Sequence, residues 1–204
     1  MGDLLIRRRE MILPPSPTSD IIYDLSTPMV FDGTTAVDTE VYLLGDYANG
    51  TAPSFSIVFD GIPSDVSGDK YYFTARCEAL NAPMINFSTY SNGNAYTAWY
   101  SNSAPTSTGS WIVNKYVRVV LTYEQNGDAI YTWLREGGTL KTKSYTTPSG
   151  AVITGASVKE SVKIGSTSTM GDSGRFVGTI SMFRIYNRKL TDAEVSDFIA
   201  NGTL

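Results

Sequence analysis

Alternation of apolar and polar residues, broken at short intervals by turn residues, constrains this chain more than any other feature. In segment 115–124, KYVRVVLTYE, one face carries Val117, Val119 and Leu121. Side chains two residues apart share one face of a β-strand, so this segment predicts a strand with one buried face. The Asn126-Gly127 pair that follows is a strong hairpin signal, and segment 128–136 is the predicted return strand.

The same pattern recurs along the chain and predicts about a dozen strands in total. The further candidates are segments 29–32, 40–44, 54–61, 71–78, 83–90, 94–100, 139–145, 160–165 and 176–186. One helix is predicted at the end, where Thr191 and Glu194 form a capping box and Gly202 is a natural stop. Because so short a helix is unstable alone, it must pack on the sheets.

These elements predict an all-β fold, a two-sheet antiparallel jelly-roll sandwich with one short C-terminal helix. Residues 29–204 form this body. Residues 1–28 read differently, since an apolar and basic stretch leads into the proline-rich segment 14–20, which favours an extended N-terminal arm.

The arm offers apolar anchors and guanidinium donors suited to the surface of a partner protein. The predicted partner-anchoring residues are Leu4, Leu5, Ile6, Arg7, Arg8, Arg9, Met11 and Ile12. A frayed terminus is the alternative reading. We expect no ordinary secretory signal and no membrane span, because the longest unbroken hydrophobic run is Val41 to Leu44.

Composition excludes several classes of function. The 204 residues include 16 basic and 20 acidic side chains, a net charge of -4 that disfavours nucleic acid as a partner. With no histidine, the chain lacks the commonest general base and metal ligand. The single Cys77 rules out an intramolecular disulfide and is most simply a small buried residue. These features favour a binding or structural protein over an enzyme.

Three segments together resemble one family. They are MVFDGTTAVDT at 29–39, the hairpin sequence at 114–145, and the closing section from VKIGSTS at 162–168 through FRIYNRKLTDAEVSDFIANG, which ends at Gly202. They are similar to laminin-G-like, concanavalin A-like lectin and glucanase jelly rolls, and the likeness covers Met29 to Gly202. The resemblance implies the sandwich fold. Where relatives often carry paired acidic residues, this chain has Ser181 and Met182, which weakens any inherited calcium site.

Some jelly rolls of this shape are glycoside hydrolases, which need two opposed carboxyl groups. The Glu-x-Asp-x-Glu string of the related glucanases does not occur here. The best substitute is Glu78 with Asp60, and a strand carboxylate beside Arg76 is more typical of an ion pair. We therefore predict no enzymatic activity, with a glycosidase as the less favoured alternative.

Calcium is the one cofactor that stays open, because sandwich lectins often bind it through loop oxygens. The candidate loops are 60–65 with Asp69, and 171–174. Neither loop has the dense spacing of acidic residues that a dedicated site requires, and turn formation through Asp side chains is the favoured reading. No cofactor is predicted.

A glycan is the ligand that the residue types favour most. Segment 90–105 places aromatic rings among amides, and sugars bind flat apolar platforms beside polar groups. The predicted ligand-binding residues are Tyr96, Trp99, Tyr100, Asn92 and Asn94. Period two puts Tyr96 and Tyr100 on one face and Trp99 on the other, so one set belongs to the core.

The preferred hypothesis is a non-catalytic structural or adhesive protein, anchored in a larger assembly by its arm with the jelly roll projecting outward. This combination resembles accessory proteins on the capsid or tail of tailed-phage virions, which would place the protein in the virion. The alternative is a free lectin-like carbohydrate-binding module outside the cell or on its surface.

Overall fold

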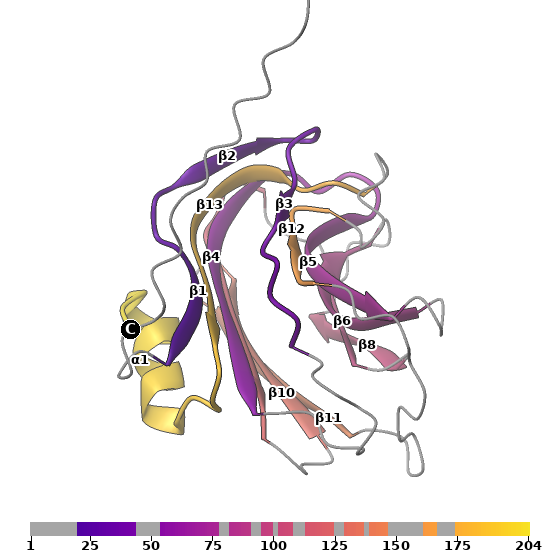
Figure 1. Ribbon diagram of the computed structural model, residues 1–204. Helices are drawn as coiled ribbons and strands as arrows, with labels where there is room; N and C mark the ends of the chain where they lie inside the picture. The colour runs from indigo at the N-terminus through magenta and orange to yellow at the C-terminus, as the bar shows by residue number, and fades with distance from the viewer. Residues whose placement is uncertain are drawn as a thin grey trace, which may run out of the picture.

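Two antiparallel sheets packed face to face make up the body of the protein (Figure 1). The computed structural model describes residues 20–43, 54–77, 82–90, 95–99, 102–107, 113–124, 129–136, 139–146, 161–166 and 174–204. Within these ranges it contains thirteen strands and one helix. The predicted all-β sandwich with one short C-terminal helix is confirmed.

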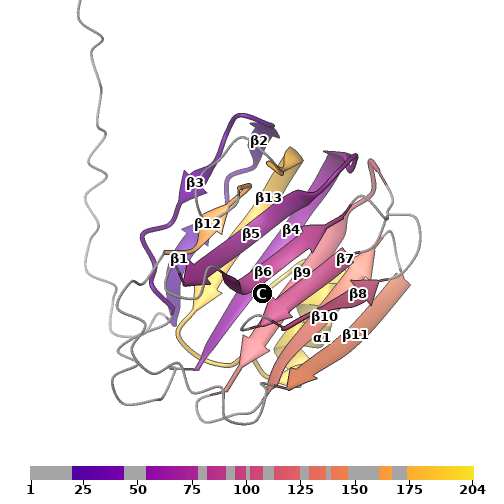
Figure 2. The ribbon, with the colours of Figure 1, turned by 90° about the vertical axis from the view of Figure 1, so that its right-hand side faces the viewer.

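The seven-stranded sheet has the order β1 (Ile21–Leu25), β13 (Val177–Tyr186), β4 (Phe55–Asp65), β9 (Val117–Tyr123), β10 (Ala129–Glu136) and β11 (Thr139–Thr146), and β2 (Met29–Asp32) also pairs with β13. The six-stranded sheet has the order β3 (Val37–Asp38), β12 (Lys163–Ile164), β5 (Lys70–Cys77), β6 (Ala82–Thr89), β7 (Ala95–Trp99) and β8 (Asn102–Ser107). Figure 2 views the second sheet from outside the sandwich.

The main hydrophobic core lies between the sheets and is rich in phenylalanine. Val117, Val119 and Leu121 of β9 are buried in it, as their alternation predicted. Phe73 of β5 and Phe183 of β13 join the two sheets, with ring centroids 5.5 Å apart. Each such ring, removed fully from water, stabilises the fold by about 2 kcal/mol.

A second core lies between the seven-stranded sheet and helix α1 (Asp192–Asn201). Val195, Phe198 and Ile199 of the helix pack against Val58 and Val120, which face away from the main core. The Thr191–Glu194 capping box forms, and Gly202 ends the helix with φ of 75°. The predicted helix, its start and its stop are all confirmed.

The arm is shorter than the sequence predicted. Residues 21–25 form β1 and pair with β13, where Leu25 lies opposite Phe183. The rings of Tyr23 and Phe183 also meet edge to face, with centroids 6.1 Å apart. The expected boundary at residue 28 is therefore wrong, because β1 is part of the sandwich; residues 1–19 lie outside the described ranges.

Other strands differ from the prediction in extent. The expected strand at 40–44 is replaced by the two-residue β3, and Glu40 has a positive φ of 56° that interrupts extension. Only Lys163 and Ile164 of segment 160–165 form a strand. β8 was not predicted because it contains Pro105, which an edge strand tolerates since its outer groups need no sheet partner.

Gly178 shows why a glycine interrupts β13. Its φ is 151°, and a Cβ there would collide with the carbonyl oxygen of Ile62. The register of β13 against β4 shifts between Val177 and Gly178. The glycine therefore permits both a close approach of two strands and an irregularity in their pairing.

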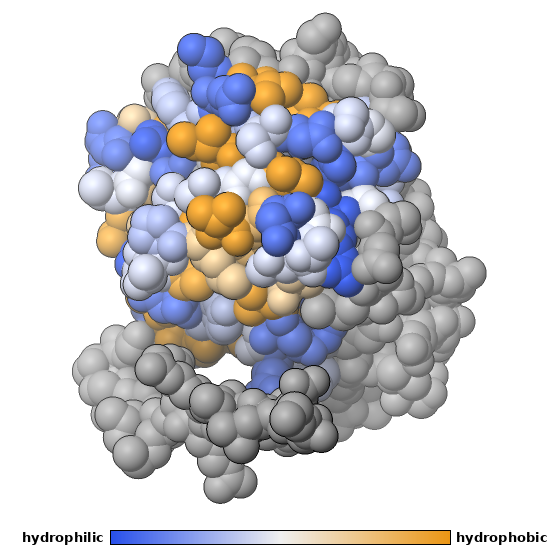
Figure 3. Space-filling view, turned by 90° about the horizontal axis from the view of Figure 1, so that it is seen from above, coloured by the Kyte–Doolittle hydropathy of each residue, from blue (hydrophilic) through white to orange (hydrophobic). Residues whose placement is uncertain are grey.

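Apolar side chains reach the surface at the end of the sandwich seen from above, interspersed with polar ones (Figure 3). Val30 is 69% exposed and Ile62 is 41% exposed, and both lie opposite Thr179 on either side of β13. A threonine thus separates them, and isolated exposed apolar residues are normal on protein surfaces. No helix within the described ranges is long and apolar enough to cross a membrane.

Candidate functional site

Polar and aromatic residues collect on the face of the six-stranded sheet that points away from the core. On β6, Ile85 and Phe87 enter the main core, so Asn86 and Ser88 between them project to the other side. On β7, Ala95 enters the core and Tyr96 projects outward. We call this side the outer face.

One row of the outer face crosses four strands. Asp38 of β3 lies opposite Lys163 of β12, which lies opposite Thr74 of β5, and Thr74 lies opposite Asn86 of β6. Directly opposed residues project on the same side of a sheet, so these four side chains form a continuous polar row.

A second row lies beside the first and carries the aromatic residues. Ser88 of β6 lies between Tyr71 of β5 and Tyr96 of β7. Tyr90 joins the two rings, since its centroid is 6.5 Å from that of Tyr71 and 4.7 Å from that of Tyr96. We call Tyr71, Tyr90 and Tyr96 the aromatic group; all three are half-buried.

Gly174 makes room for one ring of this group. The amide of Tyr71 donates to the carbonyl oxygen of Gly174 at 2.8 Å. A Cβ at residue 174 would lie 2.8 Å from the Tyr71 ring, and φ there is 77°. A glycine at this position therefore lets the connection to β13 lie against the aromatic group.

The floor of the outer face is polar and buried. Exposure is 2% for Thr74, 1% for Asn86 and 0% for Ser88. The hydroxyl of Ser88 has no hydrogen-bond partner within the described part of the chain. Burying a hydroxyl without a partner costs free energy, so this group favours a hydrogen-bond partner that the described residues do not supply.

The far end of the polar row carries charge. The ammonium of Lys163 contacts the Asp38 carboxylate and lies 2.8 Å from the hydroxyl of Ser161, which also donates to Asp38. Burial raises the pKa of Asp38, but hydrogen bonds from Lys163 and Ser161 outweigh it and leave the pKa below its ordinary value. The carboxylate stays ionised at neutral pH and balances the Lys163 charge.

The structure places only part of the predicted sugar site. Tyr96 lies on the outer face within the aromatic group. Trp99 lies in β7 opposite Ile85, and its side chain is outside what the structure describes. Asn92, Asn94 and Tyr100 lie outside the described ranges.

Six residues of the face were missed at the level of sequence: Asp38, Tyr71, Thr74, Asn86, Ser88 and Lys163. The alternation in INFS, residues 85–88, was available as a signal that two polar side chains leave the core together. Their alignment with Thr74 and Tyr71 depends on the register of β5, which includes two irregularities. Spacing along the chain does not reveal such a register.

The acidic candidates of the calcium and glycosidase hypotheses have other partners. Asp60 forms an ion pair with Arg118 at 3.1 Å, and burial raises the pKa of Asp60. Asp65 accepts from the Ser67 amide at 2.8 Å and pairs with Lys70 at 2.9 Å. Glu78 and Asp172 are outside the described ranges, within which no three His, Cys, Asp or Glu side chains gather as metal ligands do.

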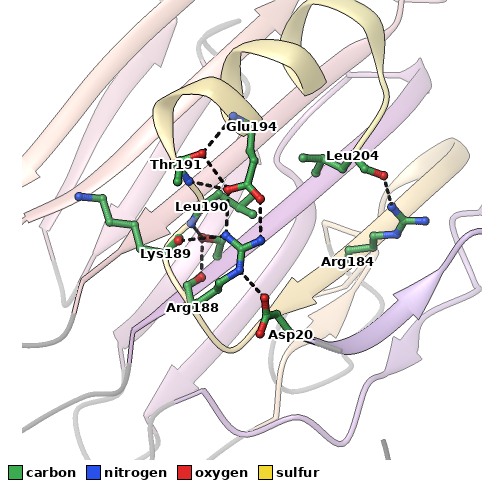
Figure 4. Close-up of polar contacts among 9 residues, drawn as sticks. Asp20, Arg184, Arg188, Lys189, Leu190, Thr191, Glu194 and Leu204 are labelled. Atoms are coloured by element: carbon green, nitrogen blue, oxygen red, sulfur yellow. Dashed lines mark hydrogen bonds and ion pairs between the residues drawn. The ribbon is translucent and has the colours of Figure 1, made fainter. Parts of the chain in front are cut away.

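A second polar cluster surrounds the start of α1 and is structural (Figure 4). Arg188 donates to both carboxylate oxygens of Glu194, at 2.8 and 2.6 Å, and to Asp20 at 2.7 Å. Arg184 donates to Asp24 at 2.9 Å. These contacts tie the helix and β13 to β1.

Comparison with known proteins identifies the sandwich. A model of the Laminin_G_3 family, described as the concanavalin A-like lectin/glucanases superfamily, matches residues 38–196. No curated protein sequence matches the chain.

Several solved structures share the fold. The CBM40 of Ruminococcus gnavus IT-sialidase, bound to α2,3 sialyllactose, has a TM-score of 0.62 at 12% identity, over 90% of this chain and 100% of that one. A leech intramolecular trans-sialidase has a TM-score of 0.62 at 13% identity, over 90% of this chain and 28% of that one. A Trypanosoma rangeli sialidase has a TM-score of 0.55 at 21% identity, over 75% of this chain and 23% of that one. The chain thus spans about a quarter of these two sialidases.

Proposed function

We propose, from the premise that this chain belongs to the Laminin_G_3 family of the concanavalin A-like lectin/glucanases superfamily, that it is a non-catalytic carbohydrate-binding module. The observation that carries the proposal is the row Tyr71–Ser88–Tyr96, in which two half-buried aromatic rings flank a buried hydroxyl that has no hydrogen-bond partner within the described part of the chain.

The chemistry of this row suits a sugar. A pyranose has an apolar C–H face that packs on an aromatic ring, and hydroxyls at its rim that exchange hydrogen bonds with amides and alcohols. The aromatic group supplies rings that keep accessible surface, and the buried Asn86 and Ser88 form a polar floor beneath them. Sites for small ligands usually have a largely apolar lining with a few polar groups.

The comparisons support a module rather than a complete enzyme. The R. gnavus CBM40, a domain of similar size, is bound to sialyllactose, and this chain covers all of it. A glycosidase requires two carboxyl groups facing one another across the substrate. On the outer face the described carboxylate is that of Asp38, and its pairing with Lys163 suits it poorly for proton transfer.

The experiment is a glycan array probed with the labelled full chain, followed by titration of the best-bound glycan. Tyr96→Ala should weaken the affinity about tenfold, because it removes a stacking surface. Ser88→Ala should weaken it as well by removing the hydroxyl at the floor. Tyr116→Ala, which removes a half-buried tyrosine immediately before β9 of the other sheet, is the control and should bind normally. No glycan bound by the wild type, or equal binding by all three variants, would contradict the proposal.

We further propose that the module serves an adhesive role in a larger assembly, the tailed-phage virion, to which residues 4–12 anchor it. The support for this role is the apolar and basic sequence of those residues, since they lie outside the described ranges. Deletion of residues 2–13, followed by analysis of purified particles, tests this anchoring role.

A further inference from the structure

The charges that the structure describes around the outer face are already paired within the protein. Lys163 is the cation of the polar row, and its side chain is 12% exposed and held between Asp38 and Ser161. Any negatively charged ligand that used this ammonium would compete with Asp38 for it. Separating a partly buried ion pair leaves a desolvated charge without compensation and is unfavourable.

The cations described beside the aromatic group are also engaged. Lys70, the first residue of β5, pairs with Asp65 at 2.9 Å. Arg175, which bridges to Tyr71, donates to the backbone carbonyl of Thr34.

Two further carboxylates lie next to strands of this sheet along the chain, since Glu40 follows β3 and Asp69 precedes β5. The whole chain also has a net charge of -4. A negatively charged ligand therefore meets an unfavourable potential on approach.

From these contacts we infer that the outer face selects uncharged glycans and discriminates against acidic sugars such as sialic acid. The inference rests on the proposed carbohydrate-binding function and adds the substrate class. A neutral hexose needs chiefly a ring to stack on, which the half-buried aromatic group supplies. An acidic sugar needs in addition a cation for its carboxylate, preferably a bidentate guanidinium.

This specificity separates the chain from its structural relatives. The R. gnavus CBM40 is bound to α2,3 sialyllactose in one structure and to α2,6 sialyllactose in another. At 12% and 15% identity the shared property is the fold, and the ligand depends on the side chains that the fold presents.

The decisive measurement compares neutral glycans with their sialylated forms, starting with lactose and 3'-sialyllactose on the same array and in titrations. The full chain should bind the neutral parent of each pair at least about tenfold more tightly than the sialylated form. Equal or tighter binding of the sialylated forms would overturn the inference while leaving the carbohydrate-binding function intact. Binding of no glycan at all would overturn both.

A variant tests the physical cause. Asp38→Asn removes the charge that balances Lys163 and keeps a carbonyl acceptor for Ser161, so it should shift the preference toward sialylated glycans about tenfold. Asp24→Asn is the matched control, because it removes a carboxylate paired with Arg184 on the other sheet. Thermal denaturation confirms that both variants fold. A folded Asp38→Asn protein with the wild-type preference would contradict the proposed cause, and the comparison of wild-type affinities stands without either variant.

Discussion

At the scale of single residues, Glu194 connects helix capping to the pH dependence of stability. Its carboxylate accepts from Arg188 at 2.6 and 2.8 Å and from the Thr191 amide at 2.8 Å. The Arg188 hydrogen bonds are the largest cause that lowers the pKa of Glu194, from 4.5 to about 2. A folded-state pKa below the unfolded value adds stability above pH 4.5 that disappears as the pH falls toward 2.

Glu194→Gln should therefore lower the free energy of unfolding by about 1 kcal/mol at pH 7, since Gln keeps the capping geometry and loses the charge. The difference from wild type should shrink between pH 4.5 and pH 2, as the wild-type carboxyl becomes protonated. Urea denaturation at pH 7, 3.5 and 2.5 measures it. Glu124→Gln, which removes an exposed partner of Lys189, is the control with little effect; a pH-independent loss in Glu194→Gln would contradict the assignment.

At the scale of elements, helix α1 depends on a strand for the charge at its C-terminus. Its last turn contains no basic residue. Instead Arg118 of β9 donates to the carbonyl oxygens of Ile199 and Ala200, at 3.2 and 3.0 Å, and also binds Asp60. A cation near the C-terminus of a helix interacts favourably with the negative end of the helix dipole. Arg118 of β9 therefore stabilises α1.

Arg118→Met should lower the free energy of unfolding by about 3 kcal/mol at pH 7, because it leaves the Asp60 carboxylate buried without its partner. Burial raises the pKa of Asp60, and a raised folded-state pKa adds stability at low pH that is lost as the pH rises. The loss should thus be smaller at pH 3.5. Urea denaturation at both pH values tests this, and Arg118→Lys, which keeps the charge, should fall between. An equal loss at both pH values would rule out the Asp60 explanation.

At the scale of the whole molecule, β1 closes one side of the seven-stranded sheet. It pairs with β13, Asp20 binds Arg188, and Asp24 binds Arg184. Because Arg188 also binds Glu194, these contacts connect β1, β13 and the start of α1. The segment predicted to be wholly an arm therefore contributes to the stability of the body from residue 20 onward.

Two truncations separate the anchoring role from the structural one. Deletion of residues 2–13 should change the free energy of unfolding by less than about 0.5 kcal/mol and should abolish incorporation into virions. Deletion of residues 2–25 should lower it by several kcal/mol, because Tyr23 and Leu25 pack against the main core. Thermal denaturation and analysis of purified particles measure the two effects. Normal incorporation after the shorter deletion would contradict anchoring through this segment.

The sequence alone determined the sandwich, the long strands and the capped helix, because alternation and capping act between residues a few positions apart. Two examples are the alternation of Val117, Val119 and Leu121 within one strand and the capping pair Thr191 and Glu194 within one helical turn. The tertiary structure decided the rest. It made residues 21–25 a strand and set the register that aligns Tyr71, Ser88 and Tyr96. It also paired Asp38 with Lys163, which lies 125 positions later in the chain. Such contacts depend on which strands become neighbours and on local register shifts, and those follow from the packing of the whole core.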